Sequence, residues 1–273
     1  MKKYVNLFVF VFMVGACFSQ GKAQTKSAVS YKNPVVDIAM PDPTVIKAAD
    51  GYFYMYATES TRNVPIMKSK DLVQWTYCNT AFTNKTRPRF EPKAGIWAPD
   101  INYINNKYVL YYAMSVWGGE QTCGIGVATA DSPQGPFTDH GKMFRSNEIG
   151  VQNSIDPSFL QYEGRNYLVW GSFRGIYVIE LTEDGLSLKP GAEKKRIAGT
   201  AFEAAYIHKH GDYYYMFASI GSCCEGIRST YKVVVGRSKK VWGPYKDKSG
   251  KPMLKNGYSS VSYTHLRAHE TKA

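Results

Sequence analysis

Residues 41–58 read PDPTVIKAADGYFYMYAT, in which an acidic residue is followed by a short apolar strand, a turn and an aromatic strand. The arrangement returns in PDINYINNKYVLYY (99–112), IDPSFLQYEGRNYLVW (155–170) and FEAAYIHKHGDYYYMF (202–217). The four acids, Asp42, Asp100, Asp156 and Glu203, are 58, 56 and 47 residues apart. A repeat of about 40 to 60 residues with several strands per unit is typical of a β-propeller. The sequence therefore predicts an all-β protein in which each repeat forms one blade and the acids occupy equivalent positions.

Turn signals divide each repeat into further strands. In the first repeat we expect strands at 42–47, 52–58, 64–69 and 74–78, and the third strands of the later repeats at 124–129, 175–181 and 231–238. The turns QGPF (134–137) and WGPY (242–245) echo one another, which supports the repeat independently of the acids. About four blades are therefore expected, in an incomplete propeller domain over residues 30–256.

The N-terminus predicts export. A basic start and an apolar run of about a dozen residues are typical of a secretory signal, and the run is shorter than the roughly 20 residues of a membrane-spanning helix. We favour a signal peptide over residues 1–23; the alternative is a lipoprotein signal that ends before Cys17. The protein is then periplasmic, secreted or an outer-membrane lipoprotein of a bacterium, with a membrane contact only if Cys17 is lipidated.

The other end of the chain lacks blade character. Residues 260–273 read SVSYTHLRAHETKA, which we interpret as a non-native tail that follows a shortened reading frame. On that interpretation the natural protein has a further blade.

The formal net charge is +12, and the positive charges are scattered along the chain. A solvated basic surface is the favoured interpretation, with attraction to an acidic polymer such as pectin as the alternative. Nucleic acid is not expected as a partner of an exported protein. The cysteines that remain after export match no zinc-binding pattern.

Three stretches resemble glycoside hydrolase family 43: WAPD (97–100), NSIDP (153–157) and CCEGIRSTYKVVVGRSKKVWGPY (223–245). The resemblance covers residues from about 33 to 256 and is strongest to arabinan-degrading, endo-1,5-α-L-arabinosidase-like members. It implies a five-bladed propeller, of which about four blades are present here. It also implies a plant cell-wall polysaccharide, arabinan or a related pentosan, as the partner.

The resemblance further implies inverting hydrolysis by three carboxyl groups. By position Asp42 is the general base, Glu203 the general acid, and Asp156 the residue that orients the acid and raises its pKa. Inversion needs a base that activates water and an opposed acid that protonates the leaving oxygen, about 6.5–9.5 Å apart. A nearby negative charge keeps the acid protonated. Asp100 falls outside this trio, and we expect it to hold its blade or line the pocket.

Four further residues are candidates for substrate binding. Trp97 and Trp117 present aromatic faces on which sugar rings stack, although core packing is the alternative for both. Asn153 and Ser172 resemble family positions that hydrogen-bond substrate, and turn formation is their alternative. No cofactor is expected for the chemistry. Arabinan-active members often hold calcium near the acids, so we expect a calcium site only in the complete protein and none here.

The sequence thus predicts an exported glycoside hydrolase that cleaves α-1,5-L-arabinan. The alternatives are an exo-acting α-L-arabinofuranosidase, a β-xylosidase, or a propeller that binds carbohydrate without cleaving it.

Overall fold

The computed structural model describes residues 31–262, of which residues 33–262 belong to one compact unit. The predicted signal segment and residues 263–273 of the predicted tail lie outside the described residues, so both interpretations stay predictions. Within the described part of the chain, no helix has the length and apolar character that crossing a membrane requires.

The unit consists of four antiparallel sheets of four strands, each formed by strands that follow one another in sequence. Blades one and two contain β1 (Thr44–Lys47), β2 (Phe53–Tyr56), β3 (Pro65–Ser69), β4 (Thr76–Thr80), β5 (Gly95–Ile104), β6 (Lys107–Ser115), β7 (Gly124–Ala130) and β8 (Thr138–Arg145). Blades three and four contain β9 (Ser158–Tyr162), β10 (Arg165–Trp170), β11 (Ile176–Glu180), β12 (Lys195–Ala198), β13 (Glu203–His210), β14 (Tyr213–Ile220), β15 (Lys232–Ser238) and β16 (Ser259–Ser262). The predicted all-β fold with four propeller blades is confirmed.

In the described part of the chain, helical structure is confined to short segments between strands. They are α1 (Ser146–Ile149) after β8, and the 3₁₀ turns η1 (Gly226–Arg228) and η2 (Met253–Lys255) before β15 and β16. The outermost strand of blade four, β16, includes residues 260–262 of the predicted tail and pairs with β15.

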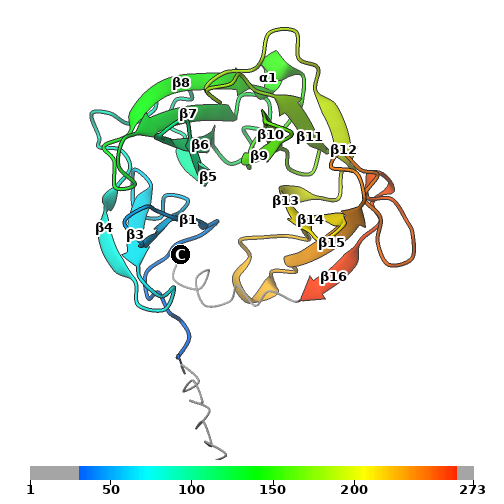
Figure 1. Cartoon of the computed structure of the whole chain (residues 1–273), viewed down its shortest axis with the longest axis horizontal. Helices are drawn as coiled ribbons and strands as arrows, with labels where there is room; N and C mark the ends of the chain where they lie inside the picture. Colours follow the sequence, from blue (N-terminus) through cyan, green and yellow to red (C-terminus); the bar gives the residue numbers. More distant parts are fainter. Residues whose placement is uncertain (1–30, 263–273) are drawn as a thin grey trace, which may run out of the picture. The chain divides into compact units, whose positions relative to one another are not determined.

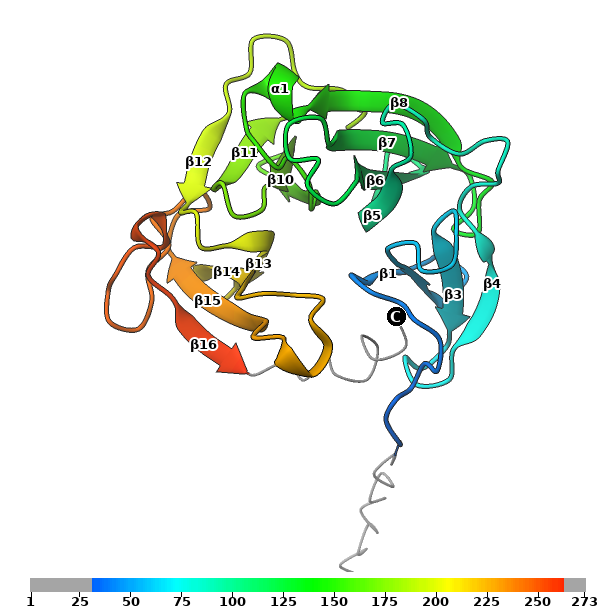
Figure 2. The ribbon, with the colours of Figure 1, turned by 180° about the vertical axis from the view of Figure 1, so that it is seen from behind.

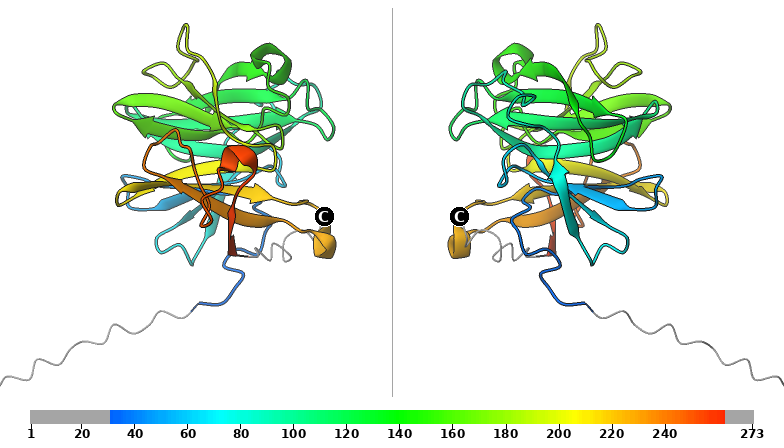
Figure 3. Two further views of the ribbon diagram at one scale, coloured as in Figure 1. Left: turned by 90° about the vertical axis from the view of Figure 1, so that its right-hand side faces the viewer. Right: turned by 90° about the vertical axis from the view of Figure 1, so that its left-hand side faces the viewer.

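The four sheets lie around a common centre with β1, β5, β9 and β13 innermost (Figures 1 and 2). Consecutive innermost strands contact one another, β1 with β5, β5 with β9 and β9 with β13. Each blade twists from its inner to its outer strand (Figure 3). This arrangement directs the N-terminal ends of the innermost strands, and the residues just before them, towards one region.

The hydrophobic core lies between adjacent blades. One cluster joins blades one and two around Tyr56, Tyr112 and Phe137, and the next joins blades two and three around Trp170. A third joins blades three and four around Phe202. Because a blade buries its faces against its neighbours, apolar residues of the inner strands fill these three interfaces.

The register of the innermost strands contradicts the predicted equivalence of the four acids. In blades two and four a bulge separates two ladder pairs, Trp97 with Ala113 and Asp100 with Tyr111, and Glu203 with Ser219 and Tyr206 with Phe217. Glu203 is therefore the counterpart of Trp97, and Asp100 is the counterpart of Tyr206. A bulge adds one unpaired residue, which sequence spacing alone does not reveal.

Every blade has one residue with a left-handed backbone at the start of its innermost strand; in blades two and four this residue lies inside the bulge, and in blades one and three it lies just before the strand. Asp42, Ala98, Asp156 and Ala204 have φ of 48°, 41°, 59° and 51°. A proline follows the first three, which restricts the preceding backbone. Asp42 and Asp156 are therefore true counterparts, whereas Glu203 lies one residue before this position. Non-glycine residues occupy the left-handed region at an energetic cost, and such strain clusters at functional sites.

Candidate active site

Asp42, Asp156 and Glu203, the predicted catalytic residues, come together at the centre of the unit. Asp42 and Asp156 lie two residues before β1 and β9, and Glu203 begins β13. The charge of Glu203 and that of Asp42 both raise the pKa of Asp156, and the charge of Asp42 raises the pKa of Glu203. Three blades thus supply carboxyl groups that lie near enough for their charges to interact.

Asp42 accepts a hydrogen bond from the Thr58 hydroxyl at 2.5 Å. The same hydroxyl oxygen accepts the backbone N–H of Ala98 at 2.7 Å, so its own proton is available for Asp42. Asp42 is exposed to solvent on one side. Burial by the surrounding protein nevertheless raises the pKa of its carboxyl group, and the hydrogen bond from Thr58 lowers that pKa. The donor favours the ionised form that a general base requires.

Asp156 and Glu203 form an interacting pair. Burial raises the pKa of Asp156 well above its ordinary range, and the charges of Glu203 and Asp42 raise it further. Burial also raises the pKa of Glu203, which is 8% exposed. Because repulsion between two carboxylates is mutual, the pair retains a proton at a pH at which isolated carboxyl groups are ionised.

Two hydroxyl groups fix the Glu203 carboxyl group. Ser172 donates to Oε2 of Glu203 at 2.7 Å, and Tyr231 also donates to Glu203; both bonds act to lower its pKa against the effect of burial. Asn153 donates from Nδ2 to the Ser172 Oγ at 2.9 Å. Asn153 and Ser172, predicted to bind substrate, therefore form a chain that ends on Glu203, and their predicted contact with substrate stays a prediction.

Trp97 and Trp117 lie together beside this site. Their ring centroids are 5.6 Å apart with the planes tilted by 51°, and Trp117 is 77% exposed. Trp97 is half-buried and packs on the small cluster of Ala113, Cys123 and Ile155, the last of which immediately precedes Asp156. An exposed indole backed by a second, anchored indole forms a platform of the kind that stacks on sugar rings.

Asp100 joins three blades. Its Oδ2 accepts the backbone N–H of Phe159 in blade three at 2.7 Å and Nδ2 of Asn102 at 2.9 Å. Its Oδ1 accepts the hydroxyl of Thr44 in blade one at 3.4 Å. Burial raises the pKa of Asp100 to about 6 against these three bonds. The carboxyl group links neighbouring innermost strands, which agrees with the blade-holding role expected for it.

Sequence reasoning missed three residues of the site: Thr58, Tyr231 and Cys223. Cys223 lies near the acids, because the charges of Glu203 and Asp42 add to burial and to the neighbouring Cys224 in raising the pKa of its thiol. Tyr231 and Cys223 belong to the 223–245 run that carries the family resemblance. That run could have directed attention to them; Thr58 has no comparable signal.

A metal site requires several ligand side chains in one place. Among residues 31–262, no three His, Cys, Asp or Glu side chains are grouped so that they could hold a metal ion. The calcium site expected in the complete protein therefore stays a prediction.

The amino-acid sequence is similar to those of known glycoside hydrolases. Residues 31–271 match the family model described as glycosyl hydrolases family 43. The chain is 39% identical over 230 residues to extracellular endo-alpha-(1->5)-L-arabinanase 1 of Bacillus subtilis (strain 168), covering 79% of this chain and 70% of that protein. It is 34% identical to extracellular exo-alpha-(1->5)-L-arabinofuranosidase ArbA of Cellvibrio japonicus (strain Ueda107), covering 80% of this chain and 69% of that protein.

The fold is similar to that of solved arabinanase structures. The Cellvibrio cellulosa alpha-L-arabinanase superposes with a TM-score of 0.75 at 32% identity, covering 82% of this chain and 78% of that one. A structure of that enzyme complexed with arabinohexaose superposes equally well, with a TM-score of 0.75.

Proposed function

Because the chain belongs to glycosyl hydrolases family 43, it is a glycoside hydrolase, and we propose that it cleaves α-1,5-linked arabinan with inversion at the anomeric carbon. The observation that carries the proposal is the meeting of Asp42, Asp156 and Glu203 from three blades, with charges that interact. The names of the relatives, arabinanases and an arabinofuranosidase, support arabinan as the substrate.

In the proposed reaction Asp42 is the base. Its carboxylate takes a proton from water, and that water attacks the anomeric carbon from the face opposite the leaving oxygen. The Thr58 hydroxyl stabilises the carboxylate before the reaction and fixes the oxygen that it contacts. The other oxygen of Asp42 remains for the water.

Glu203 is the proposed acid. Its proton passes to the leaving glycosidic oxygen as the bond to the anomeric carbon breaks. Asp156 opposes ionisation of Glu203 by charge repulsion and so helps to keep the acid protonated near neutral pH. Ser172 and Tyr231 hold the carboxyl group of Glu203 in one orientation, so that the proton is presented where the leaving oxygen lies.

The proposal includes cleavage within the polymer. Exo action is the second candidate, because one of the similar proteins is named an exo-acting arabinofuranosidase. Export is also proposed, since both curated relatives described above are named extracellular. A cell-fractionation experiment in a bacterial host tests export: protein retained wholly in the cytoplasm contradicts it.

The proposed reaction is tested on linear arabinan with the wild type and with Asp42→Asn and Glu203→Gln. Each variant should lose about 10²–10⁴-fold in turnover, the usual contribution of general acid–base catalysis. Asp131→Asn, which removes an exposed carboxyl group whose ion-pair partner among residues 31–262 is Lys107, is the matched control. NMR of the first product should show inversion, and retention contradicts a base role for Asp42. The chain lengths of the products separate endo from exo action.

A further inference from the structure

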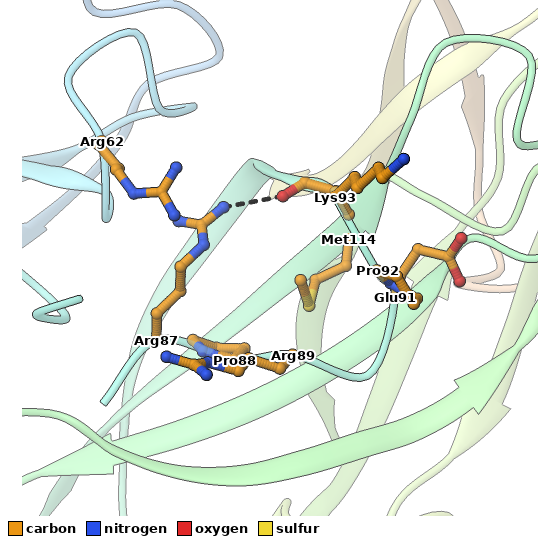
Figure 4. Close-up of a pocket in the computed structure, with 9 residues that line it drawn as sticks. Arg62, Arg87, Pro88, Arg89, Glu91, Pro92, Lys93 and Met114 are labelled. Carbon is orange, nitrogen blue, oxygen red and sulfur yellow. Dashed lines mark hydrogen bonds between the residues drawn. The ribbon is translucent and has the colours of Figure 1, made fainter. Parts of the chain in front are cut away.

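A cavity of about 400 Å³ opens beside the connection between blades one and two. None of the three proposed catalytic acids lines it. Its walls come from the β2–β3 turn, the β4–β5 connection and one residue of β6; the lining residues are Arg62, Arg87, Pro88, Arg89, Glu91, Pro92, Lys93, Ala94 and Met114 (Figure 4). A volume of this size lies within the range of small-ligand sites, about 300–1,000 Å³.

One wall of the cavity is held by a buried ion pair. Arg87 makes two parallel hydrogen bonds to Glu59 and a third, at 2.8 Å, to the backbone oxygen of Ala94, drawn in Figure 4. Glu59 also accepts the backbone N–H groups of Asn63 at 2.8 Å and Ile96 at 3.0 Å. The charge of Arg87 is thus neutralised, and the wall is fixed to the start of β5.

Three other cations of the cavity have no such partner. Glu91, the remaining acid of the lining, pairs with Arg145 at 2.6 Å. Among residues 31–262, no carboxylate pairs with Arg62, Arg89 or Lys93, and all three side chains are exposed. The cavity therefore carries an excess of positive charge.

Asn84 holds the two arginines at the cavity. Its side-chain oxygen accepts Nε of Arg62 at 3.2 Å, and its backbone oxygen accepts a terminal nitrogen of Arg89 at 2.9 Å. These bonds leave further guanidinium N–H groups of both residues available. Guanidinium groups bind carboxylates through paired N–H donors, and a cavity that collects such groups favours an anion with two oxygens.

We propose that this cavity binds the carboxylate of a uronic acid residue in an acidic polysaccharide. Pro92, which is exposed, supplies apolar surface for the C–H face of a sugar ring in front of the buried Pro88 and Met114, and a bare inorganic anion would fill little of the volume. Ala94 precedes Trp97 by three residues, about 10 Å along an extended strand. One branched polymer can therefore reach the cavity and the indole platform together; only this last expectation rests on the proposed function.

The test is calorimetric titration of the protein at low ionic strength with three probes: trigalacturonic acid, its methyl ester and inorganic phosphate. The acid should bind, with an affinity that falls as salt is added. Esterification removes the charge and should weaken binding at least about tenfold, as should the double substitution Arg62→Gln and Arg89→Gln. Arg165→Gln, which removes an exposed arginine from the start of β10, should bind as the wild type does.

Several results would overturn the proposal: no binding of the acid, equal binding of its ester, equal binding of phosphate, or an unaltered affinity of the double variant. The ester comparison uses wild-type protein and so stands even if the variant folds poorly. Asp42→Asn separates this proposal from the hydrolytic one, because it should bind trigalacturonic acid normally. Failure of the wild type to cleave arabinan leaves that binding result unaffected.

Discussion

Replacing Asp100 by asparagine should change how the stability of the protein depends on pH. Burial raises the pKa of Asp100 from 3.8 to about 6 in the folded protein. Between these values the folded state binds more protons than the unfolded state, so the free energy of unfolding of the wild type falls as pH rises through this window. A shift of about two pKa units corresponds to about 3 kcal/mol, an upper figure because Asp100 is not wholly shielded from solvent.

The asparagine side chain does not titrate but can keep the contacts. Its side-chain oxygen can accept hydrogen bonds from the backbone N–H of Phe159 and from the Asn102 amide. Its NH₂ group can donate to the Thr44 hydroxyl oxygen, and this bond replaces the one that Thr44 donates to Asp100 in the wild type. We therefore expect Asp100→Asn to gain up to about 3 kcal/mol relative to the wild type on going from pH 4 to pH 7.

Urea unfolding followed by tryptophan fluorescence at pH 4, 5, 6 and 7 measures this difference. Other titrating groups are common to both proteins and cancel. Asp131→Asn serves as the control, because exposed charges contribute little to stability and its curve should run parallel to that of the wild type. If the curve of Asp100→Asn is also parallel, the linkage between this buried carboxyl group and folding is refuted.

Three further outcomes are expected. Tyr231→Phe removes a donor that lowers the pKa of Glu203, so the alkaline limb of the kcat/KM profile should move to higher pH; a limb that stays in place speaks against Glu203 as the acid. Arg87→Met leaves the side chain of Glu59 buried without its cation and should cost about 3–5 kcal/mol in urea unfolding, whereas Arg89→Gln, at an exposed position, should cost less than about 0.5 kcal/mol. Trp117→Ala should raise KM for arabinan and spare kcat; the reverse pattern would remove Trp117 from the binding platform.

The blades were predictable from sequence because their signals are local. Apolar and aromatic runs bounded by turns such as Ala49-Asp50-Gly51 mark strands wherever they occur, and four similar runs define four blades. The three acids were found by residue type, spacing and resemblance. Their meeting follows from radial repetition, which brings equivalent ends of distant strands to one centre.

What failed was the alignment of the repeats. The sequence aligns Asp100 with Asp42 because both follow a proline, but backbone pairing sets the correspondence, and the bulge shifts it. The hydrogen-bonding chain from Asn153 through Ser172 to Glu203 depends on side-chain directions that no pattern encodes. The cationic cavity was likewise not predictable from the sequence, because the stretches that line it share no motif.

A left-handed bend recurs at the start of each innermost strand, just before β1 and β9 and within β5 and β13, whichever side chain it carries. Two of the four bends carry aspartate, at Asp42 and Asp156, and two carry alanine, at Ala98 and Ala204. The two alanines have the same left-handed backbone but carry no reactive group. A single substitution at one of these bends would add another reactive group while the backbone path stays the same. This gives the architecture a short evolutionary route from one reaction to another.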